Sequence, residues 1–124
     1  MRNSILFLFS FVQKRKGMVR RMELQDFQVI DQCLCVKLPE EIDHHHAEWI
    51  CETTDRQIMQ QKVTNVVFDF ESTKFMDSSG VGMLIGRYRR ISCFGGKVYC
   101  IHVDRQIKRM LYLSGVYRII EIMD

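Results

Sequence analysis

The 124-residue sequence has one proline, one tryptophan and no apolar run of membrane-spanning length. A helix that crosses a bilayer needs about 20 apolar residues, and the apolar run at residues 5–12 is far shorter. Hydrophobic residues make up 47% of the chain and charged residues 27%, which excludes the disordered class. The formal net charge of +3 lies largely in the first 21 residues, so the rest has no basic face for nucleic acid. One globular domain is expected, without stable membrane insertion.

Cysteine chemistry is limited as well. The five cysteines are an odd number and include no Cys-x-x-Cys pair, so neither a disulfide framework nor a zinc finger is predicted. Cys33 and Cys35 alternate along a predicted strand and should share one face, with Leu34 on the other. Buried free thiols in a reducing cytoplasm are the expected state.

Residues 1–22 are predicted to be an N-terminal extension to a domain that spans residues 23–124. Lys and Arg follow the apolar run at residues 5–12, where a signal peptide would have a small-residue cleavage site. An apolar run beside basic residues can also bind anionic lipid weakly. Met18 and Met22 are alternative initiators, so a start upstream of the true one is the preferred interpretation.

Alternation of short apolar runs with amphipathic segments predicts an α/β fold of order β-β-α-β-α-β-α-β. Loops are expected at residues 40–43 and 71–76. Strands separated by helices imply parallel pairs, whereas the first two strands form an antiparallel hairpin, so the sheet should be mixed. The predicted strands are residues 27–30, 33–38, 65–70, 97–103 and 117–123, and the predicted helices are 44–61, 78–91 and 105–113.

Residues 65–91 combine a strand, a polar turn and a helix that begins at an Asp-Ser-Ser-Gly motif, residues 77–80. Asp and Ser side chains accept hydrogen bonds from the first amides of a helix, and a helix N-terminus also favours phosphate. A capping cluster alone is the simpler interpretation. Gly80, Gly82 and Gly86 each cost about 1 kcal/mol relative to alanine within a helix. They indicate close approach, either of a neighbouring element or of a partner protein.

Three other kinds of site are disfavoured by spacing. Adjacent His44, His45 and His46 on a helix point about 100° apart and cannot converge on one metal ion. A serine nucleophile elbow needs glycine two residues before the serine, where Met76 or Asp77 stands. A phosphate-binding loop would need a glycine-rich run that ends in Gly-Lys-Ser/Thr, which is absent.

The segment FMDSSGVGMLIGRYRRI, with LPEEIDHHHAEWI upstream and GGKVYCIHVDRQIKRMLYLSGVYRII downstream, resembles anti-sigma factor antagonists of the STAS family, sporulation type. The match covers about residues 23–123. The resemblance implies the STAS fold, with a mixed sheet and packed helices. It also implies a cytoplasmic protein, monomeric when free and without a cofactor.

The resemblance further implies a partner switch. The unphosphorylated antagonist would bind an anti-sigma factor that is also a GHKL-type serine kinase with bound ATP, and so free a sigma factor. Phosphorylation of Ser78 would end binding, and a PP2C-type phosphatase would reverse it. The protein would thus be a substrate and not an enzyme; a STAS scaffold without a sigma-factor role is the alternative. The residues expected to contact the partner are Asp43, His44, Asp77, Ser79, Gly80, Gly82, Met83, Gly86 and Arg87, with Ser79 also expected as the helix cap.

Two features depart from the family pattern. Pro39 and Glu40 stand where the family usually has a glycine before the acidic residue, which changes the shape and charge of an expected contact loop. The usual final helix after the last strand is not expected, because the sequence ends at Asp124.

Overall fold

The structure is a computed structural model, and it describes residues 22–123. The predicted extension therefore lies outside the described residues, except for Met22. Met22 packs in the main core and is 9% exposed. The packing of the domain therefore reaches the last residue of the predicted extension.

Five strands form the central sheet in the order β1-β2-β4-β6-β7. Only β1 and β2 are antiparallel, and the three other neighbouring pairs are parallel, as the mixed sheet predicts. Asp31 and Gln32 join β1 to β2 with φ angles of 51° and 65°, as a tight hairpin requires. The five strands are β1 (Phe27–Ile30), β2 (Cys33–Lys37), β4 (Asn65–Asp69), β6 (Val98–Ile101) and β7 (Glu121–Met123).

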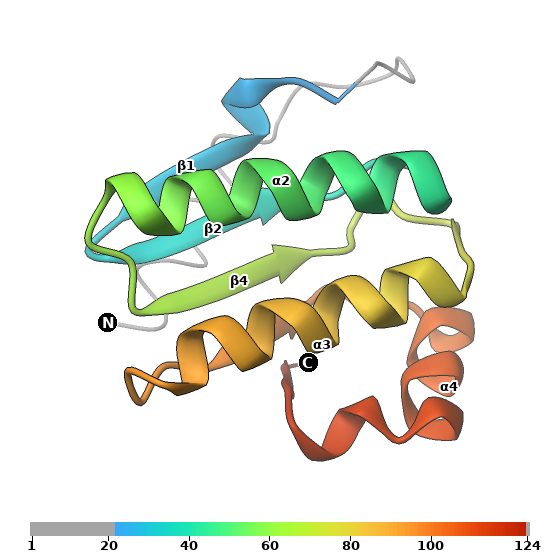
Figure 1. Cartoon of the computed structure of the whole chain (residues 1–124). Coiled ribbons are helices and arrows are strands. Elements are labelled where there is room, and N and C mark those ends of the chain that lie inside the picture. Colours follow the sequence, from blue (N-terminus) through green and yellow to red (C-terminus); the bar gives the residue numbers. More distant parts are fainter. Residues whose placement is uncertain (1–21, 124) are drawn as a thin grey trace.

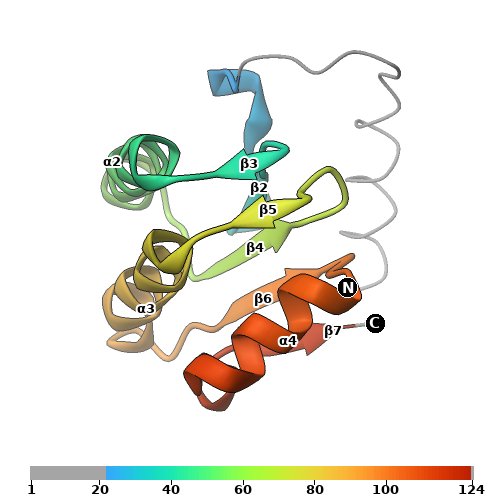
Figure 2. The same ribbon diagram turned by 90° about the vertical axis from the view of Figure 1, so that its right-hand side faces the viewer.

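Within residues 22–123, three α-helices are each preceded by an aspartate whose side chain accepts a backbone hydrogen bond from the first turn. In Figures 1 and 2, α2 and α3 lie side by side on one face of the sheet, and α4 lies near the β6–β7 edge. None of the helices in residues 22–123 is long and apolar enough to cross a membrane. The helices are α2 (His44–Gln60), α3 (Ser78–Ser92) and α4 (Arg105–Ser114), with short 3-10 turns η1 (Leu24–Asp26) and η2 (Val116–Arg118).

The two faces of the sheet carry different apolar clusters. Leu34, Val36 and Phe68 belong to the large core that the helices cover. Cys33 and Cys35 belong to a smaller cluster on the opposite face, so their predicted orientation is confirmed. All five cysteines are free thiols; Cys33, Cys35 and Cys100 are buried as predicted, whereas Cys51 is half-buried and Cys93 is exposed.

The order of the predicted elements is confirmed, with three local corrections. Residues 41–42 and 75–76, both predicted as loops, form the two-residue strands β3 (Glu41–Ile42) and β5 (Phe75–Met76). These strands pair in parallel as a separate small sheet. The last strand begins at Glu121 and not at residue 117, because η2 occupies residues 116–118.

Candidate functional site

The small sheet of β3 and β5 brings the N-termini of α2 and α3 together. Ile42 and Met76 are a register pair, and the amide of Asp77 donates to the carbonyl of Ile42 over 3.1 Å. Each strand leads directly into a helix, as Figure 2 shows. Because the strands are parallel and end in register, Asp43 and Asp77 begin the two helices at the same end of the domain.

At the start of α3, Asp77 is the cap. Its Oδ1 accepts a hydrogen bond from the amide of Ser79 over 2.8 Å. The prediction that Ser79 is the cap is therefore wrong, and Ser79 supplies the amide that is capped. Ser78 is the first residue of the helix and is exposed. Among residues 22–123, no side-chain hydrogen bond of Ser78 is found, so its hydroxyl is open to a partner.

At the start of α2, Asp43 has the equivalent role. Its Oδ1 accepts from the amide of His46 over 2.9 Å and contacts His46 Nδ1 over 2.8 Å. These hydrogen bonds lower the pKa of the Asp43 carboxyl and keep it charged. His44 is exposed beside it, whereas the His46 ring turns back onto Asp43. This end of the domain therefore carries two helix caps of negative charge.

The three glycines of α3 have different surroundings. A Cβ on Gly80 would collide with the side chain of Met76, so Gly80 is needed for packing within the domain. A Cβ on Gly82 or Gly86 would meet nothing within 4 Å. Ser78, Gly82 and Gly86 follow at intervals of four residues and share one side of the helix. Close packing inside the domain thus explains Gly80 alone, and the other two leave a flat strip that runs from Ser78.

Two predicted contact residues lie inside the domain. Met83 is 1% exposed in the core, and Arg87 is 7% exposed. Arg87 Nε lies 3.3 Å from Asp55 Oδ1, and its Nη1 lies 3.5 Å from the hydroxyl of Thr54. Met83 thus packs in the core and Arg87 joins α3 to α2, so neither side chain is presented at the surface, and their partner contact stays a prediction.

Phe75 is a surface residue that the sequence reasoning missed. It is 53% exposed, although its neighbour Met76 in β5 is buried. Alternation along β5 places Phe75 outside the core, three residues before Ser78. The available signal was a large aromatic residue in an otherwise polar connection.

Comparison with known proteins places this geometry in a family. The family model described as the STAS domain matches residues 25–124. The chain belongs to the STAS family. An anti-sigma F factor antagonist from Paenibacillus polymyxa is 34% identical over 91 residues, which cover 73% of this STAS chain and 78% of the relative.

Two solved structures of SpoIIAA match this STAS chain at 30% identity. The anti-sigma factor antagonist SpoIIAA in its unphosphorylated form has a TM-score of 0.65, over 79% of this chain and 87% of that one. The Bacillus cell fate determinant SpoIIAA in its phosphorylated form has a TM-score of 0.63, over 79% of this chain and 91% of that one. The STAS fold is therefore confirmed by structural similarity as well as by sequence.

Replacement of Asp77 tests the capping geometry. Asp77→Ala should lower the free energy of unfolding by about 1 kcal/mol, because the amide of Ser79 loses its acceptor. Asp77→Asn should retain most of that stability, since an amide oxygen also caps a helix. Thermal unfolding followed by circular dichroism measures both. Equal stability of the alanine variant and the wild type would contradict the assignment of the cap.

Proposed function

We propose that this STAS protein is an anti-sigma factor antagonist whose binding is switched off by phosphorylation of Ser78. The observation that carries the proposal is the exposed Ser78 hydroxyl at the first position of α3, where the two capped helices start together. The similarity to SpoIIAA, which is known in phosphorylated and unphosphorylated forms, supports it.

The proposed partner surface is built around Ser78, and we call it the switch surface. It consists of the charged and polar helix starts, the flat strip of α3 and one exposed aromatic side chain. Ser79 and Gly80 help to position this surface. The amide of Ser79 donates to the Asp77 cap, and Gly80 packs against Met76. The residues of the switch surface are Asp43, His44, Phe75, Asp77, Ser78, Gly82 and Gly86.

Electrostatics explains how the switch works without refolding. A phosphate on Ser78 adds about −1.5 to −2 charges at neutral pH. The N-terminal end of α3 tolerates this charge, since its amides carry partial positive charge. Asp43 and Asp77 add negative charge at the same end of the domain. A partner surface that accepts a neutral hydroxyl here is repelled, and a loss of about 3 kcal/mol weakens binding more than a hundredfold.

The proposed partners are those that the resemblance to STAS-family anti-sigma factor antagonists implies. The anti-sigma factor is a serine kinase of the GHKL type that holds ATP when it binds the switch surface. A PP2C-type phosphatase removes the phosphate and restores binding. The antagonist is then the substrate of both enzymes, acts in the cytoplasm and is monomeric when free.

A kinase assay tests the proposal. Purified full-length protein is incubated with an anti-sigma factor kinase from the same organism and labelled ATP, and the modified residue is mapped by mass spectrometry. One phosphate on Ser78, with dissociation of the complex, is expected. Stable binding without phosphate transfer would favour a STAS scaffold instead, and transfer to Ser79 would contradict the assignment of the switch residue.

A further inference from the structure

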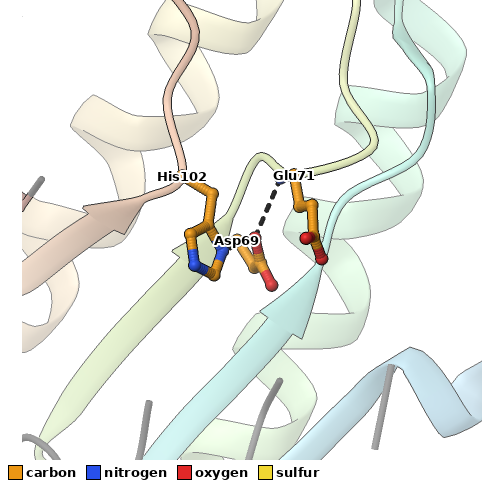
Figure 3. Close-up of side chains that lie close together, drawn as sticks. All are labelled: Asp69, Glu71 and His102. Atoms are coloured by element: carbon orange, nitrogen blue, oxygen red, sulfur yellow. Dashed lines mark hydrogen bonds and ion pairs between the residues drawn. The ribbon is translucent and has the colours of Figure 1, made fainter. Parts of the chain in front are cut away.

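A second group of polar side chains lies at the ends of two neighbouring strands, apart from the switch surface. Asp69 is the last residue of β4, Glu71 follows two residues later, and His102 comes directly after β6. Asp69 and Ile101 are a register pair, so these ends are adjacent. One ligand atom from each of Asp69, Glu71 and His102 lies within 4.8 Å of the others. In Figure 3 the three side chains lie close together, with Asp69 between His102 and Glu71.

Asp69 is the buried member of this group. Its side chain is 0% exposed, and its Oδ1 contacts His102 Nδ1 over 2.8 Å and accepts from the amide of Glu71 over 2.9 Å. Its Oδ2 is buried and has no hydrogen-bond partner within residues 22–123. A buried oxygen without a partner is costly, and a buried carboxylate more so. A cation beside Oδ2 would remove this cost.

The types of ligand atom in Asp69, Glu71 and His102 indicate which metal ions would fit. One imidazole nitrogen and two carboxylate oxygens suit Zn²⁺ and similar transition ions, whereas Mg²⁺ and Ca²⁺ prefer oxygen ligands alone. Glu71 and His102 are both exposed, so an ion has access and room for water ligands. Burial raises the pKa of the Asp69 carboxyl, and a bound cation would oppose that effect.

We propose that Asp69, Glu71 and His102 bind one divalent transition-metal ion of the Zn²⁺ type. The ion would be held by one imidazole nitrogen of His102 and by one oxygen of each of the two carboxylates. It connects the end of β4 to the end of β6. It also holds Glu71 at the start of the connection that leads through β5 to Ser78. The site does not depend on the proposed partner switch, because none of its residues belongs to the switch surface.

Metal titration tests the site. Full-length protein is freed of metal with a chelator, kept reduced, and titrated with ZnCl₂ by calorimetry and with CoCl₂ by absorbance. One ion per chain is expected, with a Co²⁺ spectrum that lacks a thiolate charge-transfer band. Asp69→Asn, Glu71→Gln and His102→Asn should each weaken Zn²⁺ binding at least tenfold. Asn is chosen for His102 because its φ of 56° is left-handed, a conformation that Asn tolerates.

His45→Gln is the matched control, since His45 is exposed in the histidine run of α2 and outside the group. It should bind Zn²⁺ like the wild type. Zn²⁺ should also raise the melting temperature of the wild type and of His45→Gln, but not of His102→Asn, because a ligand stabilises only a fold that binds it. Wild-type Zn²⁺ affinity in His102→Asn or Glu71→Gln would overturn the proposal. So would loss of binding in His45→Gln, or no saturable binding by the wild type below millimolar Zn²⁺.

Discussion

Ser78→Ala is expected to bind the anti-sigma factor in the presence of ATP and to remain bound. The variant keeps the exposed start of α3 and the cap from Asp77, because neither depends on the Ser78 hydroxyl. It lacks the atom that accepts phosphate, so the release that ends binding of the wild type cannot occur. Size-exclusion chromatography or surface plasmon resonance, over the time that phosphorylates the wild type, measures the difference.

Two further variants, Ser78→Asp and Ser79→Ala, test the same assignment of Ser78. Ser78→Asp places a permanent negative charge on the switch surface and should weaken binding strongly, towards the hundredfold loss expected of the phosphate. Ser79→Ala should still be phosphorylated and released, because Ser79 contributes its backbone amide to the cap and not its side chain. Release of Ser78→Ala at the wild-type rate would contradict the assignment of Ser78 as the phosphorylated residue.

Gly82→Ala and Gly86→Ala are expected to stabilise the domain while they weaken partner binding. Alanine removes the cost of a helical glycine, about 1 kcal/mol at each position. The added methyl group meets nothing within the domain, because no atom lies within 4 Å of it. It does project from the flat strip, and Gly82→Leu should project further and reduce partner affinity more. Thermal unfolding and a binding titration on the same samples measure the two opposite effects.

Gly80→Ala is the matched control on the same helix. Its Cβ would collide with the buried side chain of Met76, so overpacking should destabilise the domain by about 1–3 kcal/mol. A lower melting temperature for Gly82→Ala than for Gly80→Ala would show that the side of α3 at Gly82 is in contact with other residues of the domain. Unchanged partner affinity in Gly82→Leu would remove Gly82 from the switch surface.

The elements that could be predicted from the sequence are those with a local signal. The spacing of apolar residues located the strands and the three helices, and alternation placed Cys33 and Cys35 on one face. The short strands β3 and β5 escaped prediction because two residues have no periodicity. Their pairing is also a long-range event, between Glu41 and Phe75.

The candidate site was predicted in its motif but not in its geometry. The Asp-Ser-Ser-Gly motif indicated a helix start, but three neighbouring residues could each have been the cap. Arg87 was expected to contact the partner, yet its place on α3 turns it towards Asp55 and Thr54 of α2. Phe75 falls in a segment predicted as a loop and is an exposed residue of β5. The direction of the helix decides the place of Arg87, and alternation along the strand decides that of Phe75.

The two strands β3 and β5 pair in a fixed register. The lengths of the segments that lead into them should therefore vary less in evolution than the amino acids in those segments. Side chains alternate along a strand, so a one-residue insertion between Pro39 and Glu41 or before Phe75 would exchange the buried and exposed positions. An insertion before Phe75 would turn Met76 to solvent and Phe75 to the core, and one between Pro39 and Glu41 would do the same to Ile42 and Glu41. Either insertion would misalign the two helix starts. Substitutions such as Pro39-Glu40 keep the spacing, because the carbonyl of Glu40 still accepts from the amide of Lys74. Insertions and deletions in these segments should therefore be rarer among functional relatives than substitutions.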